Sequence, residues 1–174
     1  DAIDREIQRL IREAIAASNK KAGKKASRTS FAMTPEEKLI ASNLESNRGR
    51  LPWPVAEGVI TQRFGTQPHP VVRTTMIKST GITIATAPQS DARAVFDGEV
   101  MSKGSNPTVL IKHGNYITAY KNLGKVYVKK GDKIRTKQSV GQVFTNPVDG
   151  KTSLQFSLFK ASKPQNPKLW LARL

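Results

Sequence analysis

The chain of 174 residues is long enough for one domain and an N-terminal extension, since single domains usually contain about 100–150 residues. Lys and Arg number 29 against 13 Asp and Glu, and the resulting net charge of +16 favours anionic partners such as nucleic acid, anionic lipid, wall polymer or an acidic protein surface. The absence of cysteine excludes disulfides, thiolate zinc sites and a cysteine nucleophile. No apolar run approaches the ~20 residues of a membrane helix. No signal peptide is visible at Asp1, so we expect a piece of a longer chain.

Residues 1–17 are predicted to form an amphipathic helix. Ile3, Ile7, Leu10 and Ala14 recur at the spacing of a coiled-coil seam. A helix of this length is marginal alone in water, so we expect it to end a coiled coil or to pack on another part of the protein. Residues 18–33 are basic and have no apolar periodicity, which predicts a flexible linker.

A second helix is predicted within residues 34–50. Thr34 suits the N-cap, Pro35 the first helical position and Glu37 the third, so the segment can form a capping box. Gly49 is placed to end the helix. The prolines of Leu51-Pro52-Trp53-Pro54 disfavour helix, and residues 51–174 are predicted to form a separate domain.

Short β-rich runs separated by turn residues fill that domain, which predicts antiparallel strands without crossover helices. The predicted strands are Val59–Phe64, Ile82–Thr86, Ala92–Val100, Thr108–Lys112, Tyr116–Tyr120, Val126–Val128, Val140–Phe144 and Ser153–Phe159.

A set of segments within the domain follows the order found in one family. These segments are 58–65, 69–70, 81–86, 94–100, 109–114, 116–123, 128–134, 140–143, 154–158 and 166–171. Together they resemble the lysostaphin/LytM-type zinc metallopeptidase domain. The Thr-Pro-Glu-Glu helix start and the Leu-Pro-Trp-Pro-Val segment are similar to the branch of EnvC-like murein hydrolase activators. The resemblance implies a mainly β, antiparallel domain of barrel-sandwich-hybrid type, preceded by two N-terminal helices.

The family's zinc chemistry is not matched by these residues. The resemblance implies zinc ligands in an H-x-x-x-D motif and an H-x-H motif, and a further histidine in a Tyr-x-His-Leu segment. The corresponding frames fall on residues 79–83, 153–155 and 120–123, so the five positions carry Ser79, Thr83, Asn122, Ser153 and Gln155. Hydroxyls and carboxamides compete poorly with water for Zn²⁺. We therefore expect a degenerate domain with no metal, no cofactor and no catalysis.

Other sources of catalysis are not supported. The chain's two histidines, His69 and His113, fall at non-ligand positions of the family pattern, and two histidines do not complete the usual three-ligand set. No Gly-x-Ser-x-Gly elbow is present. The turn at Lys129–Ile134 followed by Val140-Gly141-Gln142 also resembles biotinyl and lipoyl carriers, but no separate hairpin carries a lysine for modification.

A groove without zinc remains a binding surface. The resemblance to EnvC-like proteins implies activation of an N-acetylmuramoyl-L-alanine amidase in the periplasm or extracytoplasmic envelope, during wall remodelling and daughter-cell separation. We expect a basic and aromatic groove rim formed by Arg63, Arg73, Lys78, Tyr116, Tyr120 and Lys121. The helix within 34–50 is a candidate regulatory segment that lies across the groove, and the upstream coiled coil is expected to contact a membrane complex.

Two alternatives stay open. The first is a peptidoglycan-binding module without an enzyme partner, since wall polymers carry carboxylates that suit a basic groove. The second is an active zinc endopeptidase with unusual ligands. A nucleic-acid partner is not expected, because no helix-turn-helix, zinc finger or aromatic platform accompanies the charge.

Overall fold

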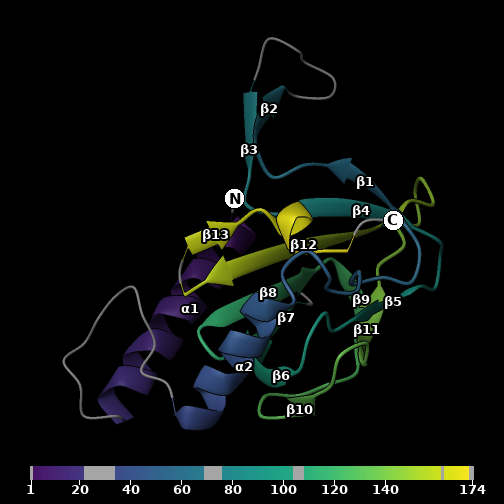
Figure 1. Cartoon of the computed structure of the whole chain (residues 1–174). Helices are drawn as coiled ribbons and strands as arrows, with labels where there is room; N and C mark the ends of the chain where they lie inside the picture. Colours follow the sequence, from purple (N-terminus) through teal and green to yellow (C-terminus); the bar gives the residue numbers. More distant parts are fainter. Residues whose placement is uncertain (1, 22–33, 69–75, 104–107, 162, 173–174) are drawn as a thin grey trace.

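The fold consists of two helices and a set of antiparallel sheets (Figure 1). The computed structural model describes residues 2–21, 34–68, 76–103, 108–161 and 163–172. Of the predicted linker, residues 18–21 extend the first helix and residues 22–33 lie outside the described part. No helix in the described ranges is long and apolar enough to cross a membrane.

Helix α1 (Ala2–Lys21) is amphipathic, as predicted, and buries one stripe of side chains. Ile7, Ile11 and Ile15 are each exposed by 2% or less. Their spacing of four residues places them on one side of the helix. The helix therefore gains its stability by packing on the rest of the protein, which is one of the two arrangements expected for it.

Helix α2 (Pro35–Ser46) begins at the predicted capping box. The Thr34 hydroxyl accepts a hydrogen bond from the backbone N–H of Glu37 at 3.2 Å. The Glu37 carboxylate accepts one from the backbone N–H of Thr34 at 3.3 Å. These two bonds satisfy amide groups that a helix start otherwise leaves without partners.

Helix α2 is anchored to the domain at two levels. Lys112 forms an ion pair of 2.7 Å with Glu37 of the first turn. Ala41 and Leu44, further along the helix, are buried in the main core. Since these contacts fix α2 to the body, the helix is part of the folded domain.

The largest sheet has eight strands, and every strand pair in the described residues is antiparallel. In spatial order its strands are β1 (Val59–Gln62), β4 (Ile82–Thr86), β12 (Thr152–Lys160), β8 (Tyr116–Lys121), β7 (Val109–His113), β6 (Gly98–Lys103) and β10 (Lys133–Ile134), with β13 (Lys163–Gln165) beside β12.

Two smaller sheets complete the domain. The first contains β5 (Asp91–Arg93), β11 (Ser139–Val143) and β9 (Leu123–Val126) in that order. The second is the hairpin of β2 (Gly65–Pro68) and β3 (Met76–Ser79), which projects from the body in Figure 1. A short 3₁₀ helix, η1 (Pro167–Leu169), follows β13.

Both faces of the large sheet are covered, and strand alternation divides the side chains between them. On β8, Tyr116 and Tyr120 belong to the main core, whereas Ile117 and Ala119 belong to the cluster that contains the isoleucines of α1. Helix α2 contributes to the main core. The two helices therefore serve different hydrophobic clusters.

The mainly β, antiparallel fold class predicted from the sequence is confirmed, with local differences. The run predicted at Ala92–Val100 is divided into β5 and β6, and the run predicted at Val126–Val128 lies mostly beyond β9. Strands β2, β3, β10 and β13 were not predicted. They are short or contain Gly or Pro, so they lack the apolar alternation that marks a strand.

His113, at the end of β7, is a buried structural residue. Its Nδ1 lies 2.7 Å from the carbonyl oxygen of Asp97, and its Nε2 lies 2.8 Å from the hydroxyl oxygen of Thr118. A carbonyl can only accept, so Nδ1 carries the proton and Nε2 accepts from Thr118. Burial lowers the pKa of His113 to about 4, which keeps the ring neutral.

We expect the free energy of unfolding to fall as the pH is lowered from 6.5 towards 4. In this window the unfolded chain protonates His113 and the folded chain does not, so protons favour the unfolded state. The difference between the pKa of 6.5 in the unfolded chain and the pKa of about 4 in the folded chain corresponds to roughly 3 kcal/mol in the free energy of unfolding. Urea unfolding measured across this pH range tests the effect. His113→Gln should lose this pH dependence, whereas His69→Asn should keep it; an unchanged dependence in His113→Gln would contradict the assignment.

Candidate functional site

Four polar residues form a row across four neighbouring strands, here called the polar row. Gln62 on β1 is the register partner of Thr83 on β4, Thr83 is that of Gln155 on β12, and Gln155 is that of Lys121 on β8. Register partners share a face of the sheet and have Cβ atoms about 5 Å apart. Two of the five positions assigned by the family pattern, Thr83 and Gln155, are therefore brought side by side.

The polar row lies on the face of the sheet that also contacts α1. Thr83 alternates with Ile82 and Ile84, which are in the main core, so its side chain points to the opposite face. On β8, Lys121 follows Ile117 and Ala119 at the spacing of residues on one face, and both of these pack with α1. The polar row is thus continuous with the apolar surface that α1 covers.

An irregularity in β1 brings Gln62 into this row. Ile60 pairs with Ile84 on the main-core face, and the register then shifts, so that Gln62 pairs with Thr83. Without the extra residue of this bulge, Gln62 would share the face of Ile60. The Thr83 hydroxyl donates to the Gln62 side-chain oxygen at 3.3 Å, which joins the two strands within the row.

Exposure changes along the row. Gln155 is exposed, Thr83 and Gln62 are half-buried, and Lys121 is only 6% exposed. The row therefore offers neutral hydrogen-bonding groups at its accessible part and an ammonium group on its most buried residue. None of its four residues can ionise to a carboxylate.

The other three family positions are engaged in local structure. The Ser79 hydroxyl donates to the carbonyl oxygen of Gly81 at 2.7 Å. The Asn122 side-chain amide donates to the carbonyl oxygen of Ser153 at 2.7 Å, and this bond links the end of β8 to β12. Asn122 has φ +68°, a left-handed conformation that Asn tolerates better than most residues. These side chains stabilise turns and strand ends beside the polar row.

Gly81 allows β4 and β12 to approach closely next to this site. A Cβ at this position would lie 2.2 Å from the carbonyl oxygen of Phe156 and 2.3 Å from the hydroxyl oxygen of Ser157. Ser157 is fully buried, and its hydroxyl has no hydrogen-bond partner in the described part of the chain. Only glycine fits here without moving one of the two strands.

The donor set does not fit a catalytic zinc ion. Ser79, Thr83 and Gln155 offer neutral oxygens, whereas zinc prefers imidazole, thiolate or carboxylate. Within the described ranges, no three His, Cys, Asp or Glu side chains converge. The ammonium of Lys121, in register with Gln155, would repel a cation held there. His113 uses both ring nitrogens elsewhere, and His69 lies outside the described residues.

The expected groove rim needs correction at two positions. Tyr116 and Tyr120 are 1% and 0% exposed, and both belong to the main core rather than to a rim. The Tyr120 hydroxyl accepts from the backbone N–H of Val95 at 3.1 Å, and the Tyr116 ring packs edge-on against Trp170 at 5.2 Å. The alternation of β8 directs both rings away from the polar row.

The four basic residues of the expected rim are not brought together at one described site. Lys121 lies in the polar row, and Arg63 is exposed at the end of β1. Arg73 falls outside the described residues, as does the side chain of Lys78. The expected position of the regulatory helix also differs, since α2 packs on the main core and α1 packs on the face that carries the polar row.

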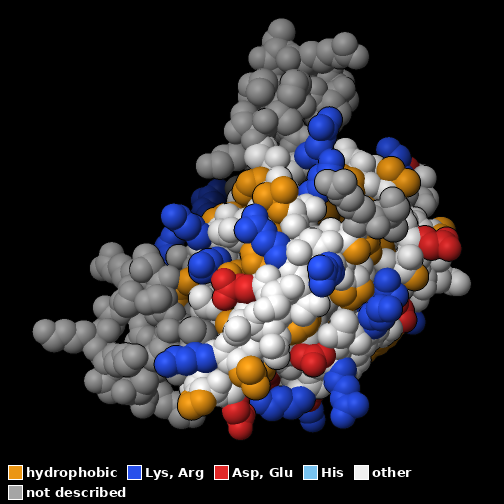
Figure 2. Space-filling view, viewed as in Figure 1, with side chains coloured by type: hydrophobic (Ala, Val, Ile, Leu, Met, Phe, Trp, Pro, Cys, Tyr) orange, Lys and Arg blue, Asp and Glu red, His pale blue; other side chains and the backbone are white. Residues whose placement is uncertain are grey.

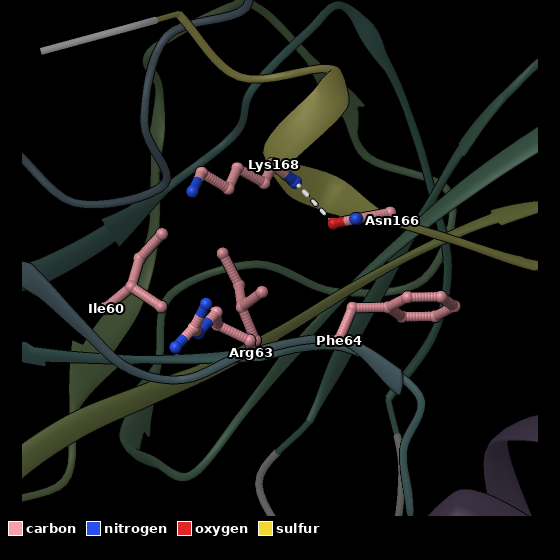
Figure 3. A pocket seen from close by; sticks show the side chains of 6 residues that line it. Ile60, Arg63, Phe64, Asn166 and Lys168 are labelled. Atoms are coloured by element: carbon pink, nitrogen blue, oxygen red, sulfur yellow. Dashed lines mark hydrogen bonds between the residues drawn. The ribbon is translucent and has the colours of Figure 1, made fainter. Parts of the chain in front are cut away.

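A pocket of about 220 Å³ lies on the main-core side of the sheet, beside β1 and η1 (Figure 3). Its lining combines apolar side chains with two cations and an amide. The lining residues are Ile60, Arg63, Phe64, Ile82, Asn166 and Lys168. Of these residues only Arg63 was predicted to lie at a site, and Asn166 and Lys168 are more than 100 positions away from it in the sequence.

The chain belongs to Peptidase family M23, whose model matches residues 77–167. It is also similar to the murein hydrolase activator EnvC of Escherichia coli (strain K12), with 26% identity over 174 aligned residues, 95% of this chain and 40% of that protein. The chain thus spans two fifths of the length of this relative. Both findings agree with the resemblance predicted from the sequence.

Solved structures show the same fold. A zinc-containing peptidase from Vibrio cholerae matches with a TM-score of 0.58 and 25% identity over 70% of this chain and 39% of that one. Lysostaphin from Staphylococcus simulans matches with a TM-score of 0.52 and 19% identity over 64% of this chain and 48% of that one. The mainly antiparallel architecture is therefore that of LytM and lysostaphin structures.

We expect the unaltered protein to retain no zinc after dialysis, and a variant with Ser79→His, Thr83→Asp and Gln155→His to retain about one ion per chain. The reason is that Thr83 and Gln155 are already register partners. Adding Lys121→Met should tighten binding by removing a nearby positive charge.

The measurement is metal content by mass spectrometry. The control places His, Asp and His at the exposed positions Ser42, Ser139 and Lys130, which lie on α2, at the start of β11 and in the turn before β10, and it should stay free of zinc. Stoichiometric zinc in the unaltered protein would contradict this account of the site.

Proposed function

We propose that this chain is a murein hydrolase activator that binds an N-acetylmuramoyl-L-alanine amidase and does not cut peptide bonds itself. The observation that carries the proposal is the polar row, in which Thr83 and Gln155 bring a hydroxyl and a carboxamide together at two positions that the family pattern assigns to zinc ligands, with Lys121 beside them. The similarity to EnvC supports the choice of activity. The proposed place of action is the extracytoplasmic envelope, in wall remodelling and daughter-cell separation.

The chemistry of the row suits binding rather than hydrolysis. The exposed carboxamide of Gln155 can both donate and accept hydrogen bonds, so it can pair with a partner's backbone. Lys121 adds a positive charge in a site of low exposure, where attraction to an acidic group is stronger than in water. The net charge of +16 favours encounter with an acidic partner surface.

A bulky residue on the row should reduce stimulation of the amidase. We expect Gln155→Trp to lower the stimulated rate by about tenfold at a fixed subsaturating concentration, because a loss of about 1.4 kcal/mol in binding produces this change. The assay is dye release from labelled cell walls by the amidase with and without the activator. Gln138→Trp, on an exposed turn away from the row, is the control and should retain activity. No stimulation by the unaltered protein at any ratio would refute the proposal.

We further propose that α1, rather than α2, regulates access to this face. Ile7, Ile11 and Ile15 pack in one cluster with Leu110 and Phe159, on the same side of the sheet as the polar row. A partner that docks over the whole face competes with α1 for this apolar surface. Displacement of α1 would then couple the region upstream of the domain to partner binding.

Loosening α1 should therefore increase stimulation. We expect a chain lacking residues 1–33, and the full chain with Ile11→Asp, to stimulate the amidase at lower concentrations than the unaltered protein. Glu13→Asp, on the exposed side of α1, is the control. Circular dichroism confirms that each variant is folded. Equal or weaker stimulation by folded Ile11→Asp would contradict a regulatory role for α1.

A second candidate function is direct binding of peptidoglycan without an enzyme partner. Figure 2 supports it, since more Lys and Arg than acidic side chains are spread over the visible face. Sedimentation with purified sacculi separates the two proposals. Sedimentation without amidase stimulation would favour the binding module.

A further inference from the structure

We propose that the pocket beside β1 and η1 binds a peptide that ends in a free carboxylate next to a small aliphatic side chain. We call this site the carboxylate pocket; its residues are Ile60, Arg63, Phe64, Ile82, Asn166 and Lys168. It lies on the main-core side of the sheet, whereas the polar row lies on the other side. The proposal therefore does not depend on amidase activation.

The charges of the carboxylate pocket point to an anion. Arg63 and Lys168 are both exposed, and none of the described residues that line the pocket is acidic. In Figure 3 the nitrogen ends of Arg63 and Lys168 lie towards the same end of the pocket, near Ile60. Two cations at one end of a concave site create a positive potential that concentrates anions there. A guanidinium also matches the planar geometry of a carboxylate.

The rest of the lining indicates what accompanies the charge. Ile60, Phe64 and Ile82 give the pocket an apolar wall, and Phe64 lies with Asn166 at the end away from the two cationic groups. The Asn166 amide can hydrogen-bond a peptide group. A volume of about 220 Å³ is sufficient for one or two small residues.

Local structure fixes the backbone at the two residues that carry the cations. The side-chain oxygen of Asn166 accepts from the backbone N–H of Lys168 at 3.1 Å, which fixes the start of η1. Pro167, between them, is buried. On the other side, Arg63 directly follows the bulge that ends β1. A pocket formed before the ligand arrives loses less conformational entropy on binding.

Titration of the full chain with short peptides tests the proposal, with backbone amide shifts in NMR spectra as the readout. The probes are N-acetyl-D-alanyl-D-alanine, N-acetyl-L-alanyl-L-alanine and the C-terminal amides of both. We expect the peptides with a free C-terminal carboxylate to shift the backbone N–H signals of Ile82 and Lys168. The C-terminally amidated peptides should bind at least about tenfold more weakly, which is the usual effect of losing a charged hydrogen bond. Preference for the D peptide would identify a wall stem peptide as the source, and preference for the L peptide a protein C-terminus.

Variants separate the pocket from the overall charge. Arg63→Gln and Lys168→Gln should each weaken binding of the free acids by about tenfold. Lys130→Gln removes the same charge from an exposed turn and should leave binding unchanged. Equal binding of acids and amides, equal loss in Lys130→Gln, or equal binding of inorganic phosphate would overturn the proposal. Amidase stimulation measured on the same variants shows separately whether the proposed function holds.

Discussion

Strand β12 divides its side chains between the hydrophobic core on one face of the large sheet and the polar row on the other. It pairs with β4 on one side and β8 on the other, so it lies within the sheet and each of its side chains is committed to one face. Leu154, Phe156 and Leu158 enter the main core. The alternate positions Ser153, Gln155 and Ser157 therefore face the side that α1 shares. A polar series on a central strand is costly for stability, since a buried hydroxyl without a partner costs about 1–3 kcal/mol.

This arrangement explains how one backbone can serve two chemistries. Residues in register on β4 and β12 have Cβ atoms about 5 Å apart, a separation from which two side chains can reach one ion or one peptide group. With carboxylate and imidazole the same positions suit a metal; with Thr83 and Gln155 they suit hydrogen bonds. Lys121, in register with Gln155, adds a positive charge beside these two positions. The backbone keeps these positions on β4 and β12 adjacent, and the side chains at them determine which ligand they can bind.

Much of this could be predicted from the sequence, because the signals were local. The capping box of α2 depends on Thr34 and Glu37, which are only three residues apart. The family motifs assigned Thr83 and Gln155 to zinc-ligand positions from the sequence alone, and the structure shows that these two residues are register partners. Which side chains of β8 point to which face of the sheet could not be predicted. Its residues are buried on both sides, so the strand reads as a nearly continuous run without the alternation that distinguishes one face from the other.

Two further features could not be predicted because they depend on contacts between distant segments. The bulge in β1 turns Gln62 towards Thr83, and no pattern within β1 marks the extra residue. The carboxylate pocket combines Arg63 with Lys168, which come together only because η1 returns to the edge of the sheet near β1. The end of α1 at Lys21 was also missed, since polar residues past residue 17 lack an apolar period even though the helix continues.

The energetics of α1 limit how the face that carries the polar row can be opened. Ile7, Ile11 and Ile15 are almost fully buried, and each contributes roughly 1.5–3 kcal/mol through removal from water. Releasing the helix without a replacement would therefore cost about 5–9 kcal/mol, a large part of the stability of an average domain. A partner that displaces α1 must cover Leu110, Ile117 and Phe159 with apolar groups of its own as well as satisfy the polar row. Charge alone can bring such a partner to the surface, but whether the partner displaces α1 depends on its apolar complementarity to the face that α1 covers.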